Sequence, residues 1–251
     1  MSNFQGISLD GMFLLAENRF RDSKSFYEEQ KPQIKKLVLD PLRDLAEDLA
    51  GPMLAVDSRI ITDPNRNGCI SRIRRDNRYT HDKSMYRENV WVGFMRDKKA
   101  FVCAPGFFAD MSAKGSTYGM GFYYATPRLM QTVRRMIDER PGPWTKALRQ
   151  AEAAGFAPYG DRYARPKKEG LSPLLDGVYN RKTVGMERFD PDPAFFGSAA
   201  LVESLQQAFT ALIPLYRLLI AAVERDVEQG IGCADASANT PAAYVAGDSA
   251  F

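Results

Sequence analysis

The sequence is poor in the two residue types that most often hold metals and cross-links. Its 251 residues include only three cysteines and one histidine, His81. The cysteines Cys69, Cys103 and Cys233 stand far apart, with no CxxC pair and no metal-ligand spacing. We therefore expect neither a zinc site nor a disulfide framework, and we predict no metal and no cofactor.

Long hydrophobic runs and a strong charge of one sign are also missing. No apolar stretch approaches the ~20 residues that span a membrane, and the N-terminus lacks the basic segment of a signal peptide. The 34 Lys and Arg against 31 Asp and Glu leave a net charge of +3, below the basic excess of typical nucleic-acid binders. These absences predict a soluble, cytoplasmic protein whose partner is neither a membrane nor a nucleic acid. Nothing in the sequence indicates an oligomeric state.

The N-terminal part of the chain has the pattern of a helix. Apolar residues recur at helical spacing over 23–50, with charged residues on the other faces. Pro32 and Pro41 are expected to break or kink this segment, and Gly51-Pro52 to end it.

The middle of the chain is rich in strand-like segments, which are expected at 69–75, 90–96, 100–104 and 118–124. The short polar link 97–99 predicts an antiparallel hairpin. A helix is expected after Thr126, which suits an N-cap position ahead of Pro127. Because helices come first, strands cluster in the middle and helices close the chain, we predict an α+β fold. Its central, mainly antiparallel sheet is flanked by N- and C-terminal helices.

The longest helical pattern covers 198–227 and shows a broad apolar stripe. We expect this helix to bury Leu201, Leu205, Phe209, Leu212 and Leu219. No linker rich in Gly, Ser or Pro separates the early helices from the strands, so residues 1–229 are predicted to form a single domain. Residues 230–251 are small and polar, which predicts a flexible or loosely docked tail.

The positive charge of the protein is concentrated in one segment, 72–88. It holds six basic residues and three acidic ones, a local excess of +3 that equals the net charge of the whole chain. Arginine binds both phosphates and carboxylates through paired hydrogen bonds. We therefore expect a small anionic ligand here, with the candidate ligand-binding residues Arg72, Arg75, Arg78, Tyr79, Lys83, Tyr86 and Arg87.

Two other interpretations of the segment remain open. In an enzyme, Asp76 or Asp82 would serve as the acid–base group in the same pocket, and His81 is a further candidate catalytic residue. In a structural or interaction module, the arginines and aspartates would instead form an internal network. The residues alone do not decide between enzyme, binding protein and structural module.

A second basic and aromatic cluster lies on the loop expected over 156–169. It is either a solvated loop or the second wall of a pocket that it forms with the first cluster. The candidates for this second wall are Tyr159, Arg165, Lys167 and Lys168.

The segment RIRRDNRYTHDKSMYR resembles the signature of an uncharacterised family, domain of unknown function twenty-four sixty-one. The family pattern is approximately Arg-x-x-Arg-Asp-x-Arg-Phe-x-x-Asp-Lys-x-x-Tyr-Lys/Arg. It is matched by Arg72, Arg75, Asp76, Arg78, Asp82, Lys83, Tyr86 and Arg87. Tyr79 stands where Phe is usual, and Met85 where commoner members have Pro. The similarity extends over most of residues 7–228, and it implies a single compact α+β domain with no assigned activity.

Overall fold

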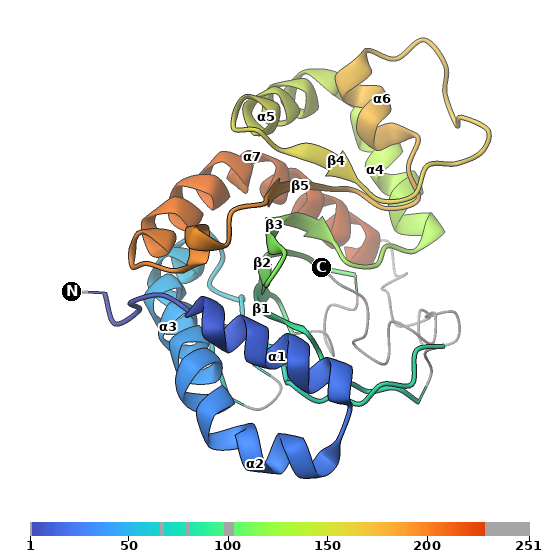
Figure 1. Cartoon of the computed structure of the whole chain (residues 1–251). Coiled ribbons are helices and arrows are strands. Elements are labelled where there is room, and N and C mark those ends of the chain that lie inside the picture. The colour runs from blue at the N-terminus through green and yellow to red at the C-terminus, as the bar shows by residue number, and fades with distance from the viewer. Residues whose placement is uncertain (1, 66–67, 79–80, 98–102, 229–251) are drawn as a thin grey trace.

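The computed structural model describes residues 2–65, 68–78, 81–97 and 103–228 (Figure 1). Its helices are α1 (Leu9–Arg21), α2 (Lys24–Ile34), α3 (Asp40–Val56), α4 (Pro127–Glu139), α5 (Pro141–Ala153), α6 (Pro173–Tyr179) and α7 (Ala200–Glu228). Its strands are β1 (Asn89–Met95), β2 (Pro105–Ser112), β3 (Gly115–Phe122), β4 (Ala157–Tyr159) and β5 (Gly185–Asp190). A π-helical turn (Lys35–Leu39) joins α2 to α3, and a 3-10 turn (Pro193–Phe196) precedes α7.

Serine caps start the first two helices. The Ser8 hydroxyl accepts a hydrogen bond from the Gly11 N–H at the start of α1, and the Ser23 hydroxyl accepts one from the Phe26 N–H in α2. Between the helices Asp22 adopts a left-handed conformation with a φ of 44°. A residue in this conformation ends a helix, so the chain leaves α1 at Asp22 and turns into α2.

The prolines shape the helical segment in a way that differs from the prediction. The expected break near Pro41 takes the form of the π-helical turn, in which the Asp40 N–H bonds to the Lys35 carbonyl. A wide turn of this kind gives the proline ring the space that a regular α-helix denies it. The expected end at Gly51-Pro52 is wrong, because α3 continues to Val56 with Pro52 inside it. Buried apolar residues on α3 outweigh the hydrogen bond that Pro52 removes.

The sheet has five strands in the order β1-β2-β3-β5-β4, and each neighbouring pair is antiparallel. This confirms the predicted α+β fold with an antiparallel sheet and terminal helices. The expected hairpin joins β1 to β2, with Met95 opposite Gly106. Its second strand begins later than predicted, at Pro105. Of the strand expected at 100–104, residues 100–102 lie outside the described residues.

The strand expected at 69–75 is replaced by an extended segment along the free edge of β1. Ile70 forms an isolated bridge with Val92. The Ser71 N–H donates to the Trp91 carbonyl at 2.9 Å, and the Gly93 N–H donates to the Cys69 carbonyl at 2.7 Å. The segment therefore pairs with β1 at only a few positions and does not form a full sixth strand.

Helix α7 forms the centre of the core. Its predicted buried residues, at most 1% exposed, are Leu201, Leu205, Phe209, Leu212 and Leu219. The helix packs against β2 and β3 and against α3, α4 and α5, and it crosses behind the strands in Figure 1. By length and composition alone, α7 is also long and apolar enough to cross a membrane. A helix buried at the centre of a globular domain has the same character, and its packing here is of that kind.

The buried apolar residues other than Phe108 form one contiguous core that extends from Phe4 to Val223. The predicted division into a domain of residues 1–229 and a tail of residues 230–251 stays a prediction, because the tail lies outside the described residues.

The two faces of the sheet have different surroundings. Side chains alternate along a strand, so Phe107 lies on one face of β2 while Phe108 and Asp110 lie on the other. The Phe107 ring packs on the rings of Phe209 and Tyr216 of α7, at centroid distances of 5.3 and 4.9 Å. Helix α7 therefore covers the Phe107 face. The opposite face, called the Asp110 face below, is turned away from α7.

Candidate functional site

The basic segment folds into a hairpin-like loop, called the signature loop (residues 72–87). Two extended arms form its base, where the Arg75 N–H donates to the Met85 carbonyl and the Arg87 N–H donates to the Ile73 carbonyl, both at 2.9 Å. Arg74 and Tyr86 form an isolated antiparallel bridge between the same arms. The second arm leads directly into β1, so the loop is fixed to the edge of the sheet.

One ion pair, between a largely buried arginine and an exposed aspartate, closes this loop. Arg75, whose side chain is 11% exposed, donates hydrogen bonds to the Asp82 carboxylate and, at 2.9 Å, to the Ser84 hydroxyl. Arg19 of α1 donates to the same carboxylate and, at 3.0 Å, to the Tyr86 carbonyl, which ties the loop to α1. Hydrogen bonds from Ser84, Arg75 and Arg19 hold the pKa of Asp82 well below its usual range.

A second pair lies nearer the solvent. Arg78 donates two hydrogen bonds to the Asp76 carboxylate, at 2.8 and 2.6 Å, and these lower the pKa of Asp76 to about 2. The Lys83 ammonium donates to the Asn77 carbonyl at 3.0 Å, while the Asn77 side-chain amide donates to the Lys83 carbonyl at 2.6 Å. Asp76 and Asp82 are thus both ionised at neutral pH and bound to arginine, which suits neither to the role of a general acid or base.

The remaining candidates of the loop have different surroundings. Tyr86 is completely buried and stacks on Tyr27 of α2, with ring centroids 4.7 Å apart. Arg72 and His81 are exposed, and Tyr79 lies outside the described residues. Arg75 and Arg78 bind different aspartates, so the contacts of the loop match an internal network more closely than a convergent anion site. Whether the loop binds a ligand stays a prediction.

The predicted second wall lies at the other edge of the sheet, beside β4. Lys168 pairs with Asp138 of α4 at 2.7 Å, and the Lys167 ammonium lies 4.5 Å from the centroid of the Tyr163 ring. Arg165 is exposed. Because β2, β3 and β5 lie between β1 and β4, the two clusters stand at opposite edges of the sheet. The two clusters are therefore separated by the width of the sheet.

Asp110, at the middle of β2, was not among the sequence-based candidates. It is half-buried, opposite Trp91 of β1 and Thr117 of β3, and it accepts a hydrogen bond from the Asn89 side-chain amide. Burial raises the pKa of Asp110 to about 7, although the Asn89 hydrogen bond and the nearby Arg87 charge act in the opposite direction. At neutral pH this carboxyl group is therefore present in both its charged and its protonated form.

The sequence does carry a signal for this residue. Asp110 is the only charged residue in the strand PGFFADMS, where a polar residue would normally face water. The strand predicted at 100–104 stops before Pro105, so it does not include Asp110. Pro is in fact tolerated at the first position of a strand.

One second-wall candidate, Tyr159, reaches the Asp110 face. Tyr159 pairs with Gly185, and its ring meets the Phe108 ring edge-on at a centroid distance of 6.2 Å. Its hydroxyl donates to the Phe122 carbonyl at 3.2 Å, and burial raises its pKa. A Cβ at Gly185 would lie 2.1 Å from Tyr159 Cε1, so a glycine is required beneath the ring. The Asp110 face thus combines aromatic rings with a titrating carboxyl group.

A family model described as "Conserved hypothetical protein (DUF2461)" matches residues 12–218. The chain belongs to the DUF2461 family. The match covers the signature loop, Asp110, Tyr159 and most of α7, so the candidate residues lie inside the DUF2461 domain. Searches among curated proteins and among solved structures found no match to this chain. In the described part of the DUF2461 domain, no group of three or more His, Cys, Asp or Glu residues is placed to hold a metal ion.

Proposed function

We propose that this DUF2461 protein binds a small molecule carrying a phosphate or carboxylate group, at the point on the Asp110 face where Arg87 and Asp110 lie close together. The observation that carries the proposal is the half-buried Asp110 carboxyl group, held by Asn89 beside the charge of Arg87. A strongly perturbed carboxyl group with defined partners is a common property of functional sites. Arg87 is also part of the signature loop, which places the loop's basic end next to Asp110.

The protonated form of Asp110 explains how an anion is accepted beside a carboxyl group. With a pKa of about 7, Asp110 takes up a proton readily, and the neutral acid donates a hydrogen bond to an oxyanion. Arg87 adds positive charge at the same place. Binding of the anion is then coupled to proton uptake, because a negative ligand raises the pKa of Asp110 further. As part of this proposal, the protein acts in the cytoplasm, the location that its composition predicts.

A second candidate function is catalysis by Asp110. A group with a pKa near 7 is suited to both accepting and donating a proton at neutral pH, which Asp76 and Asp82 are not. The reaction would be a proton transfer on the bound anion, with Arg87 stabilising negative charge. The acid–base group would then be Asp110 of the sheet, and not Asp76 or Asp82 of the signature loop.

The test is a thermal-shift screen of the full chain against phosphosugars, nucleotides and dicarboxylates. We expect one of these anions to stabilise the wild type, and Arg87→Ala and Asp110→Asn to weaken that stabilisation. Arg78→Ala is the matched control, because Arg78 is an exposed arginine of the same loop with a local partner. An anion whose effect is lost in Arg78→Ala but kept in Arg87→Ala would assign the site to the loop and refute the proposal.

Calorimetry then examines the coupling to protons. The affinity for the anion should fall as the pH rises through about 7, and binding at pH 7 should take up a fraction of a proton. Measurements in two buffers of different ionisation enthalpy give this number directly. Binding with no proton uptake in the wild type, or with the same uptake in Asp110→Asn, would contradict the role of Asp110.

A further inference from the structure

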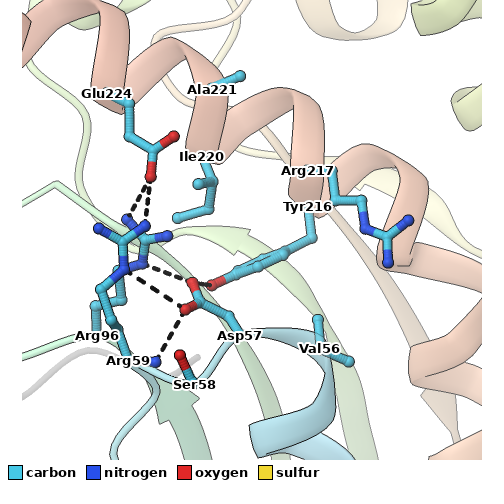
Figure 2. A pocket seen from close by; sticks show the side chains of 10 residues that line it. All are labelled: Val56, Asp57, Ser58, Arg59, Arg96, Tyr216, Arg217, Ile220, Ala221 and Glu224. Atoms are coloured by element: carbon cyan, nitrogen blue, oxygen red, sulfur yellow. Dashed lines mark hydrogen bonds and ion pairs between the residues drawn. The ribbon is translucent and has the colours of Figure 1, made fainter.

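A hollow of about 460 Å³ opens where the end of α3, the end of β1 and helix α7 meet (Figure 2). Tyr216 of α7 lines it and also packs on Phe107, so the hollow lies on the opposite side of the sheet from Asp110. Charged residues line one part of the hollow, and apolar side chains line the other. We call it the Arg59–Arg96 hollow.

The base of the hollow is a buried polar network. Asp57 accepts hydrogen bonds from Arg96 Nε at 2.6 Å, from the Tyr216 hydroxyl at 2.8 Å and from the Arg59 N–H at 2.9 Å. The Arg96 side chain is only 3% exposed. Because Asp57 is bound by three donors, this part of the network is fixed by the fold.

The mouth of the hollow is different, because an exposed carboxylate bridges two guanidinium groups there. Arg59 and Arg96 both donate to the same oxygen, Oε1 of Glu224, and Figure 2 shows the two guanidinium groups side by side beneath it. The Glu224 side chain is 42% exposed and that of Arg59 is 51% exposed. The Arg59–Glu224 ion pair, which has this much solvent contact, contributes little to stability. The buried Arg96 guanidinium keeps its hydrogen bond to Asp57 when Glu224 leaves, so the cost of moving Glu224 lies in its contact with Arg96, which a ligand carboxylate would restore.

We propose that the Arg59–Arg96 hollow binds a small carboxylate with a short apolar chain, and that Glu224 occupies the carboxylate position when this ligand is absent. The two guanidinium groups already hold one carboxylate, which shows that the spacing fits that group. Val56, Ile220 and Ala221 provide an apolar wall for the chain. A monocarboxylate replaces the charge of Glu224 one for one, whereas a phosphate dianion would add negative charge close to Asp57.

The test measures binding of hexanoate to the full chain by calorimetry, with acetate and inorganic phosphate as comparison ligands. Glu224→Gln removes the competing charge and should bind hexanoate about tenfold more tightly than the wild type. Arg59→Ala should bind it at least about tenfold more weakly. Ala221→Phe, at an exposed position of α7, should block binding while leaving every charge in place.

Three results would overturn the proposal. One is the absence of saturable hexanoate binding to Glu224→Gln, provided that this variant melts as cooperatively as the wild type. The second is a preference for inorganic phosphate over hexanoate, and the third is hexanoate binding that none of the three substitutions changes. The three substituted residues all line the hollow on the α7 side of the sheet, so a failure here is separable from a failure at the Asp110 face, which Arg87→Ala and Asp110→Asn test.

Discussion

Arg75 and Arg19 donate hydrogen bonds to the same carboxylate oxygen of Asp82, so one aspartate joins both arms of the signature loop to helix α1. Met85 adds a further tie, since its N–H donates to the Asp22 carboxylate at 2.6 Å. Asp22 is the residue with the left-handed conformation that ends α1. The most distinctive sequence of the protein therefore forms a clamp between the first helix and the edge of the sheet.

The clamp predicts that two arginines of the loop differ in their effect on stability. Arg75→Ala should lower Tm by about 4–8 °C, because it removes a shielded side chain with two hydrogen-bond partners. Arg78→Ala should lower Tm by about 2 °C or less, because its pair with Asp76 is exposed. Thermal melts of the two variants at pH 7 decide this. Equal effects would show that the Arg75 pair does not act as a clamp.

Tyr86 provides a test of whether its ring has a structural role. Its hydroxyl is buried without a hydrogen-bond partner among the described residues, so Tyr86→Phe should be neutral or raise the free energy of unfolding by up to about 1 kcal/mol. Tyr86→Ala should instead cost about 3–5 kcal/mol, because it leaves a cavity beside Tyr27. Chemical denaturation measures both. A large loss in Tyr86→Phe would reveal a function for the hydroxyl that the packing does not explain.

Asp110 should make the stability of the protein depend on pH in a defined window. Folded Asp110 keeps its proton up to about pH 7, whereas an unfolded aspartate, with a pKa of 3.8, has lost it. The contribution of this residue to stability is therefore present below about pH 4 and is lost as the pH rises to about 7. The Asp110→Asn side chain does not titrate. At pH 8 the free energy of unfolding of this variant should therefore be about 1–2 kcal/mol higher than that of the wild type.

This prediction is checked by denaturant unfolding at pH 5 and at pH 8. The difference between Asp110→Asn and the wild type should increase between these two values. If the difference is the same at both, the pKa of Asp110 is not raised in the folded protein. The proposal for the Asp110 face then loses its main support.

Gly185 of the sheet should not tolerate a larger residue, whereas Gly142 of α5 should. Gly185→Ala places a methyl group within 2.1 Å of Tyr159 and should lower the free energy of unfolding by about 1–3 kcal/mol, because the ring has to move. Gly142→Ala, in the first turn of α5 with nothing within 4 Å, is the matched control and should be neutral or slightly stabilising. If Gly185→Ala leaves the free energy of unfolding unchanged, the Tyr159 ring is not held over the sheet.

Much of the fold could be predicted from local patterns. The buried stripe of α7, the start of α4 at Thr126 and the hairpin between β1 and β2 depend on residues close together in the sequence. The predicted bounds are wrong at the end of α3 and at the start of β2. Helix α3 continues through Pro52 and β2 begins at Pro105, because packing of neighbouring apolar residues outweighs the local preference.

The candidate sites were less predictable, for a physical reason. The sequence by itself determined the α+β class, the family and the concentration of charge at 72–88, because these depend on composition, order and spacing. Only the tertiary structure decided that Asp82 is bound by Arg19, that burial raises the pKa of Asp110 and that Arg96 meets Glu224. The state of a charge depends on its burial and on its neighbours, and the fold brings those neighbours together from distant parts of the chain.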